Sequence, residues 1–321
     1  MKSKLVYVLA LIVLSGSLVF TGCKKRKAAK NEDGQASTDN RSAQGELDAG
    51  ISDANSTIQG DGLLNGKGAP AELAKVLGGP CGNSYTVDTT GRYMGKVTLN
   101  YTGISCWNRT RTGKIKLTLL NYASGVRWKH ANAQLQIEYI NYKVTRTSDG
   151  KSVELNGTAF VTNNSGGTWV DLFFASQASL VHSVSASGLN ATFDNDGTAI
   201  YNINRKFTYT YSAGVFTAVG EGTGSHDGIN NLENWGTTRK GDDFTSEVQT
   251  PIIWNTSCGA HAPLQGKVQI KVDNKSFTLN CLFGTDSNGN SMTVGPNSCP
   301  WGFKVDWTYK KKTYTKIFNY N

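Results

Sequence analysis

From Tyr85 to the C-terminus, apolar and polar residues alternate in short runs separated by Gly, Asn, Asp and Ser. Alternation with a period of two places apolar side chains on one face of a β-strand, whereas a helix repeats them every three or four residues. The pattern predicts an all-β body. We expect strands at 94–101, 114–122, 133–144, 153–162, 168–176, 179–185, 189–193, 199–211, 243–250, 267–272, 277–283 and 292–294, and a hairpin over 303–320.

The predicted strand at 133–144 changes its apolar parity halfway along. Its apolar positions are odd-numbered up to Tyr139 and even-numbered from Ile140 onward. Such a switch requires a bulge or a sharp bend, and these features let long strands curl or cross between sheets. The sequence therefore predicts a large antiparallel meander, with a curved sheet, a barrel-like sheet and a sandwich as open alternatives.

A glycine-rich stretch interrupts this pattern at 220–238, where five glycines occur in 19 residues. Such density is typical of a long loop, and long loops often carry function. No break in composition divides the body, so one domain over 81–321 is favoured. Two subdomains meeting near 214–236 are the alternative.

The N-terminus has the pattern of a bacterial secretory signal. Lys2 and Lys4 precede an uncharged run from Leu5 to Phe20, which is too short to span a bilayer comfortably. The sequence Phe20-Thr21-Gly22-Cys23 resembles a lipobox, with Phe20 where that motif most often has Leu. The resemblance implies a signal peptide over 1–22, cleavage after Gly22 and acylation of Cys23, including palmitate, as a membrane anchor.

The segment after Cys23 is predicted to be a disordered tether over 23–80. Residues 24–80 contain no Phe, Tyr or Trp and are dominated by Gly, Ala, Ser, Asn and Asp. Too little apolar surface is available to offset the entropy of the chain. As a flexible coil the segment would span roughly 40 Å, and a short helix over 70–77 is an option within it.

Net charge differs between the parts of the chain, and it limits the classes of partner that we expect. The signal carries two of the nine net positive charges and the tether balances eight cations with eight carboxylates, so the body keeps +7. Five of the tether cations lie within 24–30, beside the predicted acyl chains, where each adds roughly 1 kcal/mol of attraction to anionic headgroups. A basic body suits an anionic polymer or headgroup but also serves solubility alone. No nucleic-acid module is recognisable, so nucleic acid is not expected as a partner.

Five cysteines remain after Cys23, in a compartment where disulfides persist. Fifteen connectivities with two disulfides are formally possible. Cys281 shares a strand face with apolar residues, so we expect it to be the buried free thiol. The expected disulfides are then Cys258–Cys299 and Cys81–Cys106. None of the spacings matches a structural zinc site, so no metal is predicted.

Candidate chemistry is sparse, and no catalytic residue or cofactor is predicted. His130, His182, His226 and His261 are the four histidines, and no metallohydrolase, nucleophile-elbow or phosphate-loop motif occurs. The cluster around His226 and Asp227, with Trp235 in the same glycine-rich stretch and Trp107 beside Cys106, gives possible ligand contacts. The polar run 286–290 begins like a calcium loop but lacks its later ligands, so a turn is favoured.

Trp169 and Trp307 lie inside predicted strands and are expected to be buried, whereas Trp107 and Trp235 are expected to be exposed. Exposed, roughly coplanar aromatic rings would favour stacking on sugars.

Four segments carry a resemblance to a known group: 111–115, 141–144, 157–163 and 266–268. Together they are similar to uncharacterised β-rich lipoproteins of Bacteroidota, over most of residues 94–300. Members of that group tend to have Cys-Asp where this chain has Cys299-Pro300. The resemblance implies an envelope lipoprotein of the outer membrane, and it implies no reaction.

The favoured hypothesis is a lipid-anchored cell-envelope protein with a non-catalytic binding or structural role, its partner a polysaccharide or another envelope protein. A carbohydrate-binding surface lipoprotein and an envelope hydrolase are the alternatives, followed by a barrel that encloses a lipid. The periplasmic and the surface side of the membrane both remain open.

Overall fold

The computed structural model describes residues 32–66, 85–106, 108–175, 177–259, 262–273, 277–293, 298–309 and 311–320. The helices are α2 (Glu32–Gly60), α3 (Gly62–Asn65) and α5 (Trp169–Phe174), with single 3₁₀ turns η2 (Arg92–Met94) and η3 (Tyr122–Ser124). The strands are β1 (Tyr85–Asp88), β2 (Lys96–Cys106), β3 (Arg109–Leu119), β4 (Ala133–Arg146), β5 (Ser152–Asn163), β6 (Leu180–Phe193), β7 (Gly197–Ser212), β8 (Val215–Gly222), β9 (Gly224–His226), β10 (Ile229–Thr237), β11 (Asp243–Asn255), β12 (Gln265–Val272), β13 (Phe277–Thr285), β14 (Gly302–Tyr309) and β15 (Lys312–Asn319).

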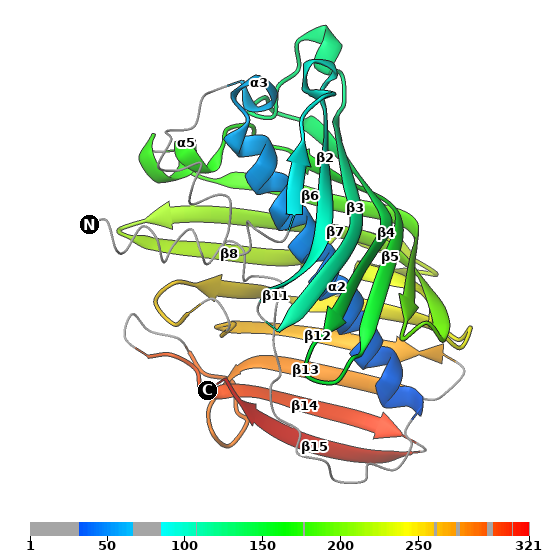
Figure 1. The fold of residues 1–321 in the computed structure, drawn as a ribbon. Helices are drawn as coiled ribbons and strands as arrows, with labels where there is room; N and C mark the ends of the chain where they lie inside the picture. The colour runs from blue at the N-terminus through cyan, green and yellow to red at the C-terminus, as the bar shows by residue number, and fades with distance from the viewer. Residues whose placement is uncertain are drawn as a thin grey trace.

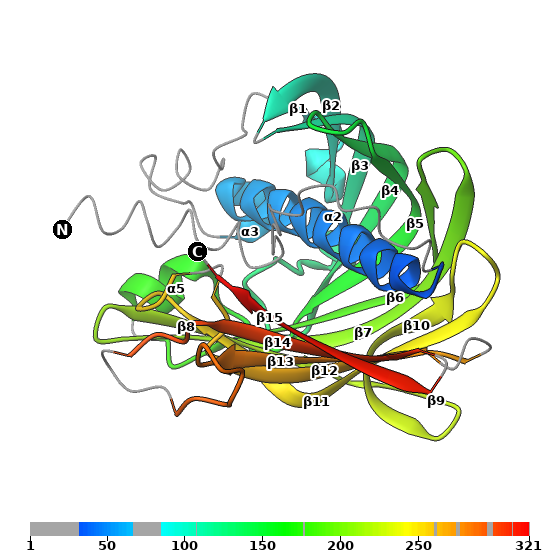
Figure 2. The ribbon, with the colours of Figure 1, turned by 90° about the horizontal axis from the view of Figure 1, so that it is seen from below.

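All fifteen strands belong to one antiparallel sheet, which confirms the predicted fold class. The main order is β1-β2-β3-β4-β5-β6-β7-β10-β11-β12-β13-β14-β15. The sheet is strongly curved, and α2 lies across its concave side (Figures 1 and 2). Strands on both sides of 214–236 pair within this same sheet.

The predicted bulge in the fourth strand is present. The register between β4 and β5 shifts between Tyr139 and Tyr142, and Asn141 has a left-handed φ of 48°. The shift turns the even-numbered apolar residues to the face that carried the odd-numbered ones, so Tyr139 and Tyr142 are both buried. The change of parity in the sequence therefore located a real bend.

Two strands share one place in the sheet. The first half of β7 pairs with β10 and its second half with β8. In the same way, β11 pairs first with β10 and then with β8. Hence β10 and β8 lie end to end between β7 and β11.

The prediction of a disordered tether is wrong for residues 32–66. Helix α2 spans 29 residues, about 43 Å at 1.5 Å per residue. Its side chains Ala43, Leu47, Ile51, Ala54 and Ile58 are buried in the largest apolar core, together with the concave face of β1 to β7. Burial of these side chains against the sheet provides the stabilisation that the composition of the segment alone does not provide. The option of a helix over 70–77 lies outside the described residues.

Segment 168–176 was predicted as a strand, but it forms helix α5. Thr168 is the N-cap, with its side chain accepting from the backbone N–H of Asp171, and Trp169, Leu172 and Phe173 are buried. A capping hydroxyl three residues before an acidic residue starts a helix more strongly than β-branched neighbours favour a strand.

The prediction of a long loop at 220–238 is also wrong. Strands β9 and β10 form a hairpin there, joined by Asp227 and Gly228 with φ of 49° and 77°. Positive φ at both turn residues is typical of the tightest hairpins. Two further predictions differ from the structure. The strands predicted at 179–185 and 189–193 are one strand, with a register shift between Ala186 and Leu189. In place of the strand predicted at 292–294, the described residues form only an isolated bridge between Thr285 and Ser291.

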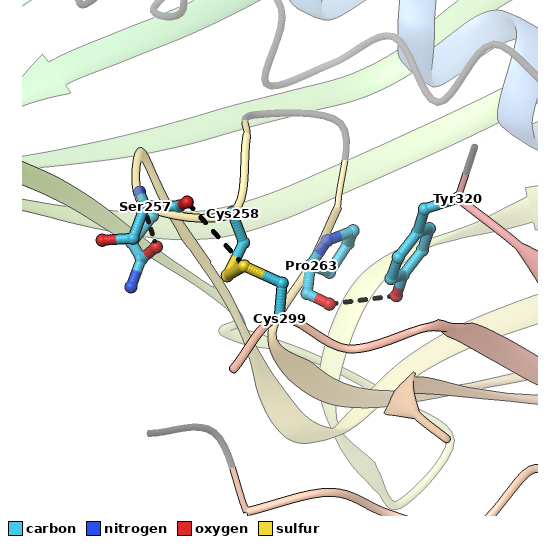
Figure 3. Close-up of a disulfide and its surroundings, with 6 residues drawn as sticks. Ser257, Cys258, Pro263, Cys299 and Tyr320 are labelled. Carbon is cyan, nitrogen blue, oxygen red and sulfur yellow. Dashed lines mark hydrogen bonds between the residues drawn. A yellow bond between two sulfur atoms is a disulfide. The ribbon is translucent and has the colours of Figure 1, made fainter. Parts of the chain in front are cut away.

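The predicted disulfide Cys258–Cys299 is present, and Cys281 is a buried free thiol, as expected. The disulfide joins the segment after β11 to the segment before β14, close to the hydrogen bond from the Tyr320 hydroxyl to the Pro263 carbonyl (Figure 3). Closing a loop with a sequence separation of 41 stabilises the fold by roughly 4 kcal/mol on the chain-entropy account. Cys106 is also disulfide-bonded. Cys81, its predicted partner, lies outside the described residues, so that pair stays a prediction.

Candidate functional site

The hairpin β9–β10 brings together three of the four residues predicted to contact a ligand. The rings of His226 and Trp235 stack with centroids 5.8 Å apart and planes 19° apart. The Nε2 atom of His226 lies 3.4 Å from Oδ2 of Asp227, and both side chains are exposed. Trp235 is half-buried and covers Gly224, where an added Cβ would lie 2.5 Å from the indole ring. The fourth residue, Trp107, lies outside the described residues.

The other described histidines have local partners. His182 is fully buried, and burial lowers its pKa to about 3, so it is neutral at physiological pH. The rings of Trp128, Trp169 and Tyr209 surround it at centroid distances of 5.5 to 5.9 Å. The Nδ1 atom of His130 accepts from the backbone N–H of Arg127 at 3.3 Å. His261 lies outside the described residues.

The tryptophans expected in the core divide between two environments. Trp169 is buried as expected, although in α5 instead of a strand. Trp128, which was not predicted to lie in the core, is also fully buried. Trp307 lies in β14, partly buried, with its ring stacked on Tyr314 at 5.5 Å.

Asp286 forms the centre of a polar turn. Its carboxylate accepts the backbone N–H groups of Asn288 and Asn290 at 2.9 and 2.8 Å. The hydrogen bond from the Asn290 backbone is the main reason that the pKa of Asp286 is lowered. These bonds support a turn instead of a calcium loop. Among the described residues, no group of three or more His, Cys, Asp or Glu side chains could hold a metal ion.

The densest set of buried charges lies between α2 and the concave face, which we call the trough. Four arginines line it, here named the trough arginines: Arg109, Arg111, Arg205 and Arg239. Arg109 and Arg111 project from β3, Arg205 from β7, and Arg239 from the turn between β10 and β11. Sequence reasoning did not identify them.

Each trough arginine is paired with a carboxylate of α2. Arg239 donates two hydrogen bonds of 2.6 Å to Asp39. Arg205 donates to Asp48 at 2.6 and 3.2 Å. Such two-pronged pairs fix orientation as well as charge.

Glu46 forms ion pairs with both arginines of β3. Its carboxylate oxygens lie 3.0 Å from Arg109 and 3.7 Å from Arg111, and its side chain is 7% exposed. Buried ion pairs of this kind hold two elements in one register, because removing either partner leaves a desolvated charge.

Electrostatics at Arg205 shows how strongly these pairs are coupled. Burial alone would lower the pKa of Arg205, but the Asp48 carboxylate, with smaller contributions from Glu233 and Tyr209, outweighs burial and the pKa is raised. Glu233 lies nearby, accepts from the Ser246 hydroxyl at 2.7 Å, and has a pKa raised by burial.

Asp53 is the fourth acidic residue of α2 that faces the sheet, and it has a different partner. It accepts a hydrogen bond of 2.7 Å from the Tyr101 hydroxyl. Burial raises the pKa of Asp53 to about 6, while Tyr101 and Arg111 oppose the rise. This carboxyl group therefore titrates just below neutral pH.

Asp53→Asn should change the dependence of stability on pH. A carboxyl whose pKa is raised by folding stabilises the native state below its unfolded pKa near 3.9, and this contribution is lost as pH rises through about 6. Asn avoids the charged form and can still accept from Tyr101. We expect the variant to be more stable than the wild type by about 2 kcal/mol at pH 8, a value reduced because the side chain keeps some solvent contact. At pH 4 the two should be equal.

Urea denaturation of both proteins at pH 4, 6 and 8 measures this difference. A difference in unfolding free energy that does not change with pH would contradict the raised pKa of Asp53.

Several buried polar atoms meet at the C-terminal end of α2. Trp128 Nε1, His182 Nε2, Asn163 Oδ1 and Gln59 Nε2 have no hydrogen-bond partner among the described residues. They are neighbours, because Asn163 pairs with His182 across β5 and β6 and donates to the Trp128 carbonyl at 2.9 Å. Gln59 accepts from the backbone N–H of Trp169 at 3.0 Å. Buried polar groups of this kind cost roughly 1–3 kcal/mol each unless they find a partner.

The arrangement supports binding chemistry more directly than catalysis. The trough combines an apolar floor, tyrosines and four arginines, and the hairpin surface combines an aromatic pair with a carboxylate. Among the described helices, none has the length and apolar character needed to cross a bilayer. No match to this chain was found among protein-family models, curated proteins or solved structures.

Proposed function

We propose that this chain is a lipid-anchored cell-envelope protein with a non-catalytic binding role, and that its body stands close to the membrane. The lipobox-like Cys23 supports the anchor. The observation that carries the proposal further is that α2 begins at Glu32, only nine residues later, and is packed into the sheet. Nine residues reach at most about 30 Å. The body is thus held nearer to the bilayer than a long flexible arm would hold it.

The binding role is supported by the trough. Arginines and tyrosines recognise anionic and hydroxyl-bearing groups, and here they do so with the carboxylates of α2 on the concave side of the sheet. An envelope protein or an anionic polysaccharide fits this chemistry. The resemblance to envelope lipoproteins of Bacteroidota favours the outer membrane as the location.

Replacing the anchor residue tests the proposal. Cys23→Ser should reduce the membrane-associated fraction of the protein by at least about tenfold, because acyl chains contribute roughly 0.8 kcal/mol per buried CH₂ group. Cell fractionation with metabolic palmitate labelling measures both the location and the modification. Substitution of the neighbouring Thr21→Ser serves as the control and should leave both unchanged.

A Cys23→Ser protein that is unlabelled but stays in the membrane fraction would exclude the lipid as the anchor. Protease treatment of intact cells, with wild-type protein, then distinguishes the surface side from the periplasmic side.

Carbohydrate binding at the β9–β10 hairpin is a second candidate. The observation in its favour is the stacked pair of His226 and Trp235, a half-exposed aromatic surface with Asp227 beside it. Aromatic faces of this kind stack on sugar rings while a carboxylate accepts from hydroxyl groups. A glycan array with the soluble Cys23→Ser chain tests this candidate.

A further inference from the structure

We propose that the trough is a receptor for an acidic amphipathic helix, which α2 fills within the chain and which a helix of a partner protein with the same charge pattern can fill in its place. The inference rests on the proposed binding role and specifies the chemistry of the partner.

The carboxylates of α2 pair with side chains from different strands and from the turn between β10 and β11. Arg239 forms an ion pair with Asp39, the arginines of β3 with Glu46, and Arg205 with Asp48. Tyr101 of β2 donates a hydrogen bond to Asp53. From Asp39 to Asp53 the helix rises about 21 Å. The trough therefore recognises a line of negative charge along a helix, and not a single anionic group.

The contact also depends on the helical backbone. The Tyr139 hydroxyl donates to the Leu47 carbonyl at 3.0 Å. An added Cβ at Gly50 would lie 2.7 Å from the Tyr139 ring and 2.9 Å from Ile115. The floor of the trough thus requires a helix that approaches closely through a small residue, which is typical of a helix bound in a groove.

An apolar floor makes a helix a better occupant than a polysaccharide or a lipid. The side chains of Leu99, Ile115, Leu117, Leu135 and Ile137 are fully buried beneath α2. A polyanion alone would leave this floor exposed to water, and a lipid would not supply charges spaced over about 21 Å. An acidic helix with an apolar stripe covers the floor and pairs with every trough arginine.

The sequence of α2 makes it a weak occupant. It contains Gly45, Gly50 and Gly60 and many Ser, Thr, Asp and Asn residues, all poor helix formers. Ser52 Oγ, Asn55 Oδ1 and Gln59 Nε2 are buried without hydrogen-bond partners among the described residues. A helix of low intrinsic propensity, which depends on its contacts with the sheet, can be exchanged for one that forms more readily.

The test uses the full chain with Cys23→Ser, so that its outcome does not depend on lipidation. The probe is a fluorescent peptide with the sequence of residues 32–60, the acidic peptide. A matched peptide, called the neutral peptide, carries Asp39→Asn, Glu46→Gln and Asp48→Asn, the three positions that pair with the trough arginines. Because the helix in the chain competes at high effective concentration, binding is measured by anisotropy to the wild-type trough and to a Gly50→Leu chain, in which the added side chain displaces α2.

We expect the acidic peptide to bind the Gly50→Leu chain at least about tenfold more tightly than the wild-type chain. The neutral peptide should bind the Gly50→Leu chain at least about thirtyfold more weakly, because Asp39, Glu46 and Asp48 are the partners of the four trough arginines and their loss leaves these cations unpaired. Equal binding of both peptides would overturn the proposal. So would binding of alginate, or of vesicles of phosphatidylglycerol, without binding of the acidic peptide.

A second measurement covers the case in which Gly50→Leu fails to fold. Cys281 is buried, which raises the pKa of its thiol to about 12, and Arg41 of α2 lies close enough to oppose this rise. In the otherwise wild-type chain, the acidic peptide should raise the rate of Cys281 labelling by a thiol reagent several-fold and with saturation, and the neutral peptide should not. A rate unaffected by either peptide would show that α2 is a fixed part of the core.

Sedimentation of the wild-type chain tests whether the helix that fills the trough can be α2 of a second copy of the chain. A dimer that the acidic peptide dissociates would identify α2 of a second copy, and would overturn the assignment to a different protein. A monomer supports it. Failure of the anchor is detected separately, because it appears in cell fractionation and not in these binding experiments.

Discussion

Arg205→Met lowers the free energy of unfolding by about 3 kcal/mol or more, because the substitution leaves Asp48 and Glu233 without their cation. The Arg205 side chain is 5% exposed and its bond to Asp48 is 2.6 Å long. Methionine replaces the aliphatic part of Arg205 but not the guanidinium, so the loss comes mainly from the unpaired carboxylates. Urea denaturation at pH 7 measures the effect.

A neighbouring ion pair gives the control for this prediction. Lys206 lies 2.8 Å from Glu221, but both side chains are more than a third exposed. Lys206→Met should therefore cost less than about 1 kcal/mol. Adding Asp48→Leu to Arg205→Met should recover part of the lost stability, since the buried charge is removed. Equal costs for Arg205→Met and Lys206→Met would mean that the trough pairs are as weak as surface pairs.

Gly113→Ala destabilises the protein by roughly 3–5 kcal/mol, from strain of a left-handed backbone and from a direct collision. Gly113 has φ of 89° at the bulge between β3 and β4, and an added Cβ would lie 2.0 Å from the carbonyl oxygen of Asn141. Neither backbone can move away without breaking the adjacent ladder. Thermal and urea unfolding measure the loss.

Gly125→Ala isolates the contribution of the backbone. Its φ is 86°, almost that of Gly113, yet nothing lies within 4 Å of an added Cβ. We expect a cost of about 1 kcal/mol at this position. If both alanine variants lost the same stability, the close approach of β4 to Gly113 would contribute nothing.

The alternating part of the chain was predictable because a strand carries its own burial pattern. The parity change at Tyr139 located the bulge in β4, and the side chains sharing a face with Cys281 located the buried thiol. In both cases two-residue periodicity alone determines which side chain points inward. The four remaining cysteines still allow three pairings, and the expected pair Cys258–Cys299 is the one present.

Helix α2 was missed because its apolar stripe is narrow and lies in a segment that is otherwise polar. Ala43, Leu47, Ile51, Ala54 and Ile58 do recur at helical spacing, but the segment has no aromatic residues and is rich in Gly, Ser, Thr, Asp and Asn, which are poor helix formers. Its stability comes from the sheet, which local composition does not describe. The spacing was a usable signal, and overall polarity outweighed it.

The predictions for α5 and for the β9–β10 hairpin were wrong, although the sequence contains a signal for each. Thr168 and Asp171 form the capping pattern that begins α5. Asp227 and Gly228 are the strongest two-residue hairpin signal, although they lie in a stretch where glycines suggested a loop. In both cases a specific turn or cap chemistry outweighed the general composition.

The trough could not have been derived from local patterns. Asp39 and Arg239 are 200 residues apart, and Asp48 and Arg205 are 157 apart. No spacing rule connects such residues, and only the curvature of the sheet brings them together. The His226 and Trp235 pair was accessible because its members lie within one hairpin.

The end-to-end placement of β8 and β10 divides the sheet into regions that can open separately. Around β8, α5 and the ends of β6, β7 and β11 is a small apolar core of its own, including Trp169, Phe173 and Phe216. Because β8 meets β10 at their ends, its ladders to β7 and β11 can break while those of β10 persist. Amide hydrogens of β8 should therefore exchange with solvent through a partial opening, ahead of the strands beneath α2 and with a lower free energy than global unfolding.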